Sequence, residues 1–167
     1  MPNEIHPIAL PDAFLTALGR MMVNWSQLEG ILDFVLIKLM GASVNDIRFH
    51  IPFAQMTFQA KMECLKSITD SLQDAPGNED AHARFKKVIL PKLNGLQTHR
   101  NQITHCKWAL RGTRITRGRL KAKGKVEITE NTVTLLEIEK MAADILETSG
   151  NLWAMVAFPE FNQPGPA

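Results

Sequence analysis

Residues 18–40 read LGRMMVNWSQLEGILDFVLIKLM, and apolar side chains recur in them at steps of three and four. Such spacing is typical of one face of an amphipathic helix. The stripe consists of Leu18, Met21, Trp25, Leu28, Leu32, Val35 and Leu39, with Ile31, Phe34 and Ile37 adding apolar surface outside it. A helix that is apolar on more than one side is buried on more than one side. We therefore expect a long helix from about Pro11, a favourable first helical residue, to Met40, with Gly41 ending it. This helix either lies centrally in the bundle or packs both on its own domain and on a second copy of the chain.

Two more helices are expected before the middle of the chain. The second follows a plausible cap at Ser43 and meets a break or kink at Pro52, so its stronger part is about 53–72. The third covers about 78–105 and begins at a capping asparagine. Pro91 lies inside this third helix and predicts a kink or a split there.

The stretch 107–130 has a different character, because three glycines interrupt it and part of it alternates as a strand does. Residues 126–129 alternate apolar and polar side chains, and 108–110 are a possible partner strand, so we interpret the stretch as a β-hairpin or a basic flap. Residues 134–137, TLLE, form a capping box that opens a last helix. Gly150 is expected to weaken or bend that helix, whose apolar stripe consists of Leu135, Ile138, Ala142, Ile145, Leu152 and Val156.

These elements predict an all-α fold. We expect an up-and-down bundle of about four main helices with a small β-hairpin or flap before the last helix. Residues 1–10 are expected to form an N-terminal arm and 11–158 one helical domain, in which 107–130 is the insertion. The tail, 159–167, is expected to be loose.

The composition is typical of a soluble protein in a reducing compartment. The chain is 45% apolar and 22% charged, and its two cysteines, Cys64 and Cys106, form neither a C-x-x-C pair nor a disulfide framework. The first residues lack the basic and apolar regions of a secretory signal, and no apolar segment is long enough to span a bilayer. We therefore expect a cytoplasmic protein that does not bind membranes.

Charge is distributed unevenly along the chain. Residues 81–126 contain 13 Lys or Arg and no Asp or Glu, whereas the flanking segments 1–80 and 127–167 are both acidic overall. A middle third without a carboxylate is a candidate site for a polyanion. The alternative is a solvated basic loop on an otherwise acidic protein.

The third helix carries the candidate site. Its apolar stripe, Ile89, Leu93 and Leu96, continues with Arg100 where an apolar residue is expected. A guanidinium is rarely buried without a partner, so Arg100 either pairs with a carboxylate of the first helix, Glu29 or Asp33, or lines an interface or cleft. Asn101 and His105 lie four residues apart on the neighbouring face, so the three side chains can converge near the helix end. The helix dipole there favours a protonated histidine, which is a proton donor.

Residues 100–105, RNQITH, resemble the R-x4-6-H motif of the HEPN superfamily, including the customary polar residue directly after the arginine. The motif closes a long helix that a further helix follows, as in that superfamily. Residues 24–29, NWSQLE, are similar to the first helix of many small bacterial and phage members. As architecture, the resemblance covers about 11–157.

The resemblance implies a helical bundle that pairs as a homodimer, with two motifs facing each other across one composite cleft. It also implies a metal-independent endoribonuclease, in which the 2′-OH of the RNA attacks the adjacent phosphate and leaves 2′,3′-cyclic phosphate and 5′-OH ends. Carried over to this chain, His105 is the general acid or base and Arg100 holds the phosphate. Asn101 orients the histidine or the phosphate. The ion pair and the phosphate contact of Arg100 are compatible if Glu29 holds Arg100 in place.

The basic flap is then expected to grip the RNA through Lys107, Trp108, Arg111, Arg114, Arg117, Arg119, Lys121 and Lys123. The resemblance further suggests a toxin or defence component with an antitoxin or regulatory partner protein. Some members carry a tyrosine shortly after the histidine. Cys106 and the two residues after it stand there in this chain, so that role does not carry over.

Other interpretations remain open from the sequence. The alternative to the nuclease is a catalytically silent module that binds nucleic acid, a nucleotide or a protein partner. His105 can be a structural histidine that a backbone carbonyl satisfies, and Cys106 beside it can be a nucleophile. The spacing of His99, His105 and Cys106 matches no standard zinc pattern, so we expect no metal and no cofactor.

Overall fold

The computed structural model describes the backbone of residues 9–71, 79–111, 113–123 and 125–157, and their side chains except at 79–81, 111, 119–128 and 156–157. In chain order the elements are α1 (Asp12–Leu39), α2 (Ile47–Gln55), α3 (Phe58–Ser71), α4 (Glu79–Arg84), the π-helical turn η1 (Phe85–Ile89), α5 (Leu90–Thr104), β1 (Lys107–Arg111), β2 (Arg114–Lys123), β3 (Lys125–Thr132) and α6 (Leu135–Ala157). The expected tail, 159–167, and the expected arm up to residue 8 lie outside the described residues.

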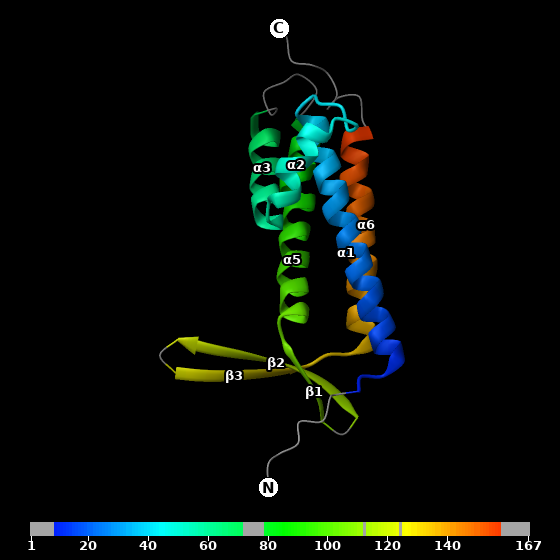
Figure 1. Cartoon of the computed structure of the whole chain (residues 1–167), viewed down its shortest axis with the longest axis vertical. Coiled ribbons are helices and arrows are strands. Elements are labelled where there is room, and N and C mark those ends of the chain that lie inside the picture. The colour runs from blue at the N-terminus through cyan, green and yellow to red at the C-terminus, as the bar shows by residue number, and fades with distance from the viewer. Residues whose placement is uncertain (1–8, 72–78, 112, 124, 158–167) are drawn as a thin grey trace.

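The helices form a bundle, and a small sheet crosses one of its ends (Figure 1). α1 and α6 lie side by side and run in the same direction. The side-chain amide of Asn24 donates to the carbonyl of Ala142 at 2.8 Å, and further along both helices the rings of Phe34 and Trp153 stack 4.6 Å apart. α5 runs in the opposite direction, so that its C-terminal end meets the sheet (Figure 1). The predicted bundle with a small β element before the last helix is confirmed.

α1 is the central helix that the sequence predicts. Its predicted stripe is buried from Met21 to Val35, and two residues beyond it, Leu36 and Ile37, are also buried. Pro11 lies one position before the helix, as its N-cap, rather than at the first helical position. Gly41 has a φ of +72°, and its N–H and the next one donate to carbonyls of the last turn, as in a Schellman motif. α1 thus contributes nine buried side chains to the core.

The predicted second helix is two helices, and the expected cap and break were both misplaced. Residues 43–46 form a turn, in which the N–H of Asp46 donates to the carbonyl of Ser43 at 3.0 Å. The helix therefore starts later, where Asp46 Oδ1 accepts the backbone N–H two residues on at 3.1 Å. Pro52 lies inside α2, and the chain breaks after it, before Thr57, whose hydroxyl caps α3.

This extra break sets the direction of the remaining helices. α2 leads the chain back, so that α3 starts beside the middle of α1, with the rings of Phe58 and Trp25 4.6 Å apart. Further along both helices Lys61 of α3 pairs with Asp33 of α1 at 2.6 Å, so α1 and α3 run in the same direction. α1, α3 and α6 therefore run in one direction, and the continuous segment of α4, η1 and α5 runs in the opposite one (Figure 1).

The predicted third helix is continuous in backbone direction but changes type before its proline. α4 passes through the π-helical turn into α5, and the N–H of Leu90 donates to the carbonyl of Phe85, five residues back. Pro91 follows directly and has no N–H to donate, so the widened turn absorbs the missing bond. The expected cap at Asn78 lies outside the described residues.

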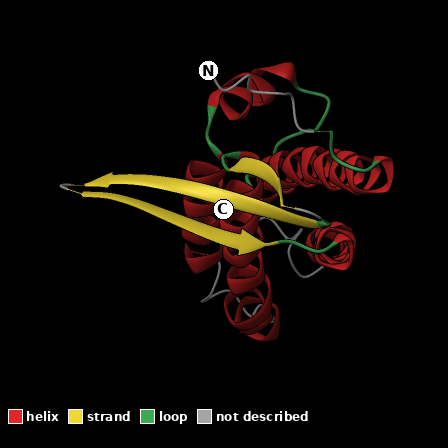
Figure 2. Cartoon of the chain, turned by 90° about the horizontal axis from the view of Figure 1, so that it is seen from below, coloured by secondary structure: helices red, strands yellow, loops and turns green. Residues whose placement is uncertain are grey.

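The stretch 107–130 is a three-stranded antiparallel sheet in the order β1-β2-β3, and not a hairpin of two strands. The expected pairing of 108–110 with 126–129 is wrong, since both pair with β2, which lies between them. β1 extends along β2 only as far as the Lys107–Gly118 pair. Beyond that pair β2 and β3 continue as a two-stranded ribbon past the helices (Figure 2).

The capping box at the start of α6 is confirmed. Thr134 Oγ1 accepts the N–H of Glu137 at 3.2 Å, and Glu137 Oε2 accepts the N–H of Thr134 at 2.6 Å. The Thr134 hydroxyl also donates to Glu137 Oε2, at 2.9 Å. The backbone hydrogen bond first and the hydroxyl one second lower the pKa of Glu137, and Arg117 adds to the shift. The predicted stripe is buried at Ile138, Ala142, Ile145 and Leu152, and α6 continues through Gly150 without a break.

We predict that Glu137→Ala lowers the free energy of unfolding by about 1 kcal/mol at neutral pH, as the loss of a helix cap does. A carboxyl whose pKa is lowered on folding stabilises the fold above its unfolded pKa, and this contribution is lost as the pH falls through the folded pKa. The difference between the variant and the wild type should therefore shrink below pH 4.5, the ordinary value for this group.

Urea unfolding at several pH values measures this difference. Glu139→Ala is the matched control, because Glu139 is an exposed carboxylate of the same helix outside the capping box. An equal pH dependence in both variants would contradict the assignment of the shift to the capping box.

Candidate functional site

The C-terminal end of α5 places His105 at the surface. His105 is the C-cap residue, and its backbone N–H donates to the carbonyl of Asn101 at 3.2 Å. The hydroxyl of Thr104 and the thiol of Cys106 donate to two other carbonyls of the last turns. The imidazole of His105 is exposed and has no hydrogen-bond partner among the described residues. The structure therefore does not support the alternative in which a backbone carbonyl accepts a hydrogen bond from this ring.

His105 shares a surface hollow of about 370 Å³ with three side chains of α5. Thr98, Asn101 and Gln102 line it with His105, and steps of three and four place all four on one face of the helix. The sequence analysis placed Asn101 and His105 together, and the structure agrees. It missed Thr98 and Gln102, which the same spacing would have indicated.

Arg100 takes an unexpected partner. Its guanidinium carbon lies 5.4 Å from the centre of the Trp25 ring, in a cation–π contact with α1. Its Nη1 donates to Asn101 Oδ1 at 3.1 Å, whereas its Nε is buried without a partner. Arg100 thus does not line the hollow of His105 but is joined to it through Asn101.

The expected ion pair of Arg100 with the first helix is absent. Within the described part of the chain, neither Glu29 nor Asp33 lies within ion-pair distance of the guanidinium. Asp33 pairs with Lys61 of α3 instead, at 2.6 Å, and Lys61 is only 6% exposed. Glu29 is therefore not the support of Arg100 that the sequence predicted, because the Trp25 ring occupies that role.

The sheet brings further cations to the end of α5. Lys107 and Arg114 are exposed, and Arg117 is half-buried, with its Nη2 donating to Gln102 Oε1 at 3.1 Å. The expected RNA contacts at Arg111, Arg119, Lys121 and Lys123 involve side chains outside the described residues. Their backbones lie at the end of β1 and along β2.

Trp108 packs against the core. Its ring meets that of Phe14 edge-on, with centroids 5.5 Å apart and planes at 78°. Trp108 is half-buried and anchors β1 to the start of α1. Its expected role as a platform for a nucleobase stays a prediction, and the packing gives it a structural role.

Cys106 is poorly suited to act as a nucleophile. Burial raises the pKa of its thiol, and the nearby positive charge of Arg117 offsets this only in part. A raised pKa disfavours the thiolate, which is the reactive form. Among the described residues, no group of three or more His, Cys, Asp or Glu is arranged to hold a metal ion.

A second cavity, of about 250 Å³, lies between α5, the sheet and α6, and the sequence analysis missed it. His99 and Arg117 line it from α5 and β2, and Lys140 and Asp144 line it from α6. These residues are far apart in the chain, and no local spacing links them. Only the packing of α6 against the end of α5 brings them together.

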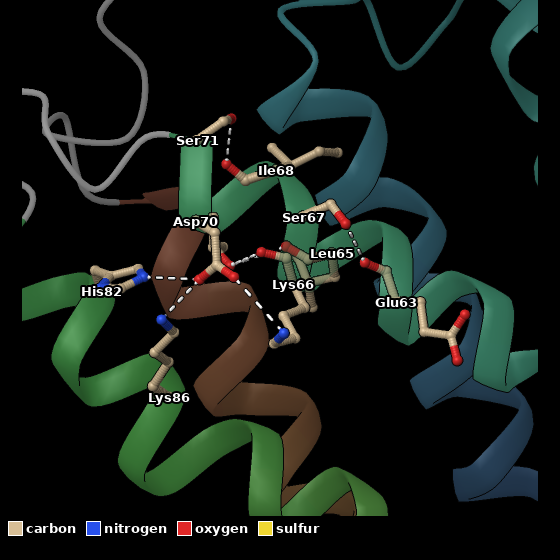
Figure 3. Close-up of polar contacts among 10 residues, drawn as sticks. Glu63, Leu65, Lys66, Ser67, Ile68, Asp70, Ser71, His82 and Lys86 are labelled. Atoms are coloured by element: carbon tan, nitrogen blue, oxygen red, sulfur yellow. Dashed lines mark hydrogen bonds and ion pairs between the residues drawn. The ribbon is translucent and has the colours of Figure 1, made fainter.

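A cluster of titratable groups lies at the end of α3, away from the sheet (Figure 1), and Figure 3 shows its contacts. Asp70 of α3 accepts from His82 at 3.1 Å and from Lys86 at 3.0 Å, and Lys66 lies 3.8 Å away. These contacts, the one with His82 first, lower the pKa of Asp70. They connect α3 to α4 and η1 across residues 72–78. His82 is only 7% exposed, and we assign the cluster a structural role.

We predict that the residues of the site differ in their effect on stability. Arg100→Ala should lower the free energy of unfolding by about 1 to 2 kcal/mol, because it removes the cation–π contact and the packing of the side-chain stem. Asn101→Ala and His105→Ala should change it by less than about 0.5 kcal/mol, since both side chains are exposed. Urea unfolding measures all three. A large loss in His105→Ala would mean that the imidazole supports the fold.

Comparison with known proteins adds no relative to this picture. No family model matches the chain, and no curated protein and no solved structure matches it either. Within the described residues, no helix combines the length and the apolar character that crossing a membrane requires. The function must therefore be argued from the side chains at the end of α5.

Proposed function

We propose that the chain is a metal-independent endoribonuclease that acts as a homodimer, with its RNA site at the C-terminal end of α5. One observation carries the proposal: the exposed, uncommitted imidazole of His105 shares a hollow with Asn101, and the Asn101 amide oxygen holds the guanidinium of Arg100. A proton-transfer group and an anion-binding group thus lie beside each other. The resemblance of 100–105 to the HEPN motif supports the same assignment.

In the proposed reaction the 2′-oxygen of the RNA forms a bond to the adjacent phosphorus as the bond to the 5′-oxygen breaks. A neutral imidazole accepts the proton of the 2′-OH, and a protonated imidazole donates a proton to the departing 5′-oxygen. Two copies of His105 in one composite cleft supply both states. Arg100 stabilises the charge that develops on the phosphate, since its Nη2 has no partner among the described residues.

The surroundings of the hollow favour a polyanion. Lys107 and Arg114 are exposed on the sheet that follows α5. Positions 117, 119, 121 and 123 of β2 are Arg, Arg, Lys and Lys, at the period of two that places residues on one face of a strand. We propose that the sheet and the ribbon of β2 and β3 bind the RNA backbone on either side of the cleaved bond.

The homodimer and a role in defence are part of the proposal. Large apolar side chains of α6 are exposed, with Leu136 71%, Leu146 57% and Trp153 49% accessible. Apolar surface of this kind is a common feature of protein interfaces. A second copy of the chain is the partner that the resemblance implies, and an antitoxin or regulatory protein would control the activity of a toxin.

The alternative is a catalytically silent module that binds nucleic acid, a nucleotide or a protein partner. The position of Arg100 favours it, because a guanidinium packed on Trp25 has a structural use that needs no reaction. This alternative keeps the basic sheet as a binding surface and assigns His105 no proton transfer.

We predict that the wild type cleaves a mixed RNA pool in the presence of EDTA and leaves 2′,3′-cyclic phosphate ends. His105→Ala should lower the rate by at least about a hundredfold, which is the usual contribution of a general acid or base. Asn94→Ala is the matched control, because it removes an exposed polar side chain of the same helix that lines neither the hollow nor the cavity. Mapping of product ends checks the chemistry.

Circular dichroism and light scattering show whether each variant keeps its fold and mass. Equal loss of cleavage in Asn94→Ala and His105→Ala would sink the assignment of His105. If the wild type is silent but binds RNA, the alternative module is supported and the nuclease proposal fails.

Binding provides a separate prediction about the sheet. The double variant Lys107→Ala, Arg114→Ala should make the negative slope of log K against log salt concentration shallower by about one to two. Each phosphate contact contributes about 0.7 to 0.9 to that slope. The double variant Arg84→Ala, Lys87→Ala is the control, since these exposed cations lie before the N-terminal end of α5, whereas the sheet follows its C-terminal end. Fluorescence anisotropy at four salt concentrations measures the slopes. Equal slopes in the two double variants would contradict an RNA surface on the sheet.

A further inference from the structure

The cavity between α5, the sheet and α6 has the character of a ligand site. Its floor consists of core side chains, each at most 7% exposed: Leu96, Ile103, Val133, Ile138 and Met141. A small number of polar groups stand around this apolar floor, as in ligand pockets generally. The volume of about 250 Å³ lies below the roughly 300–1,000 Å³ of pockets for drug-sized molecules, so the cavity suits one small ring system.

Three polar side chains of the cavity are not used by the fold, whereas Arg117 and Glu137 are hydrogen-bonded. Within the described part of the chain, the side chains of His99, Lys140 and Asp144 form no hydrogen bond or ion pair. Lys140 and Asp144 lie four residues apart on α6, a spacing at which opposite charges commonly pair, and yet they remain separate. The cavity therefore offers one uncommitted carboxylate, one uncommitted ammonium group and one uncommitted imidazole beside an apolar surface.

One side-chain pair connects this cavity to the hollow of His105. Arg117 lines the cavity, Gln102 lines the hollow, and the two are joined by the 3.1 Å hydrogen bond between them. A polymer that crosses this pair places one unit in the hollow and the next in the cavity. An extended polyanion with flat rings fits both places.

We propose that the cavity is a subsite for the base of a nucleotide next to the cleaved bond, an inference that rests on the proposed function. The flat ring would lie on the apolar floor, and the backbone phosphate would meet Arg117 and Lys140. The carboxylate of Asp144 accepts hydrogen bonds and cannot donate them when ionised. It therefore selects bases with an exocyclic amino group, and cytosine over uracil, which has a carbonyl oxygen at that position.

NMR titration of the full chain with cytidine and uridine monophosphates tests the subsite directly. The cytidine nucleotide should bind roughly tenfold more tightly, the lower range of what a good base contact supplies. Asp144→Asn should bring the two affinities close together, because an amide presents a donor as well as an acceptor. Lys140→Met should weaken both nucleotides equally. Glu139→Gln is the control, because this carboxylate of α6 does not line the cavity.

Competition separates this inference from the proposed function. The cytidine nucleotide should still bind to His105→Ala and should be displaced by RNA, whether or not the chain cleaves RNA. Binding of neither nucleotide, or an unchanged preference in Asp144→Asn, overturns the subsite. Binding that RNA does not displace overturns it as well, since the cavity would then accept a free nucleotide. Loss of cleavage alone, with displacement intact, counts only against the nuclease.

Discussion

The contact between Trp25 and Arg100 joins the core of the bundle to the candidate site. Trp25 is 2% exposed and packs against Phe58 on α3, so its ring is fixed by two helices before Arg100 meets it. The guanidinium packs on this ring and also donates to Asn101. The orientation of the last turns of α5, and with it the position of His105, therefore depends on the packing of α1.

The sheet extends this dependence beyond the helices. β1 starts two residues after His105, and Trp108 fixes it to Phe14 at the start of α1. In the register of β1 and β2, Trp108 lies opposite Arg117, so anchoring one strand also positions the other. Arg117 then reaches back to α5 through its hydrogen bond to Gln102. The basic sheet is thus held against two helices, against α1 through Trp108 and against α5 through Arg117.

Elements with a strong local signal could be predicted from the sequence, but the contacts between residues far apart in the chain could not. The stripe of α1 and the capping box of α6 each follow from a few neighbouring residues, and the structure confirms both. β2 was missed because its many charges hide the alternation by which a strand is identified. The sequence put the break at Pro52, because a proline is the stronger local signal. Pro52 lies inside the short helix α2 instead, and the break comes after it, before Thr57.

The same distinction applies to the site. Spacing alone put Asn101 and His105 on one face of a helix, and it identified Arg100 as an interruption of the apolar stripe. It could not identify the partner of Arg100, because a carboxylate and an aromatic ring on α1 satisfy the same pattern. The cavity lined by Arg117 and Asp144 left no signal at all, since its walls come from three separate elements.

The choice of an aromatic partner matters for the chemistry. An ion pair with Glu29 or Asp33 would neutralise Arg100, whereas a ring contact leaves its full charge available to an anion. A guanidinium is more weakly hydrated than an ammonium group, so it packs on a ring at lower cost. Lys61 also pairs with Asp33, one of the two carboxylates of α1 that could otherwise have paired with Arg100. The core thereby keeps Arg100 both fixed in place and positively charged, as an anion-binding group beside His105 requires.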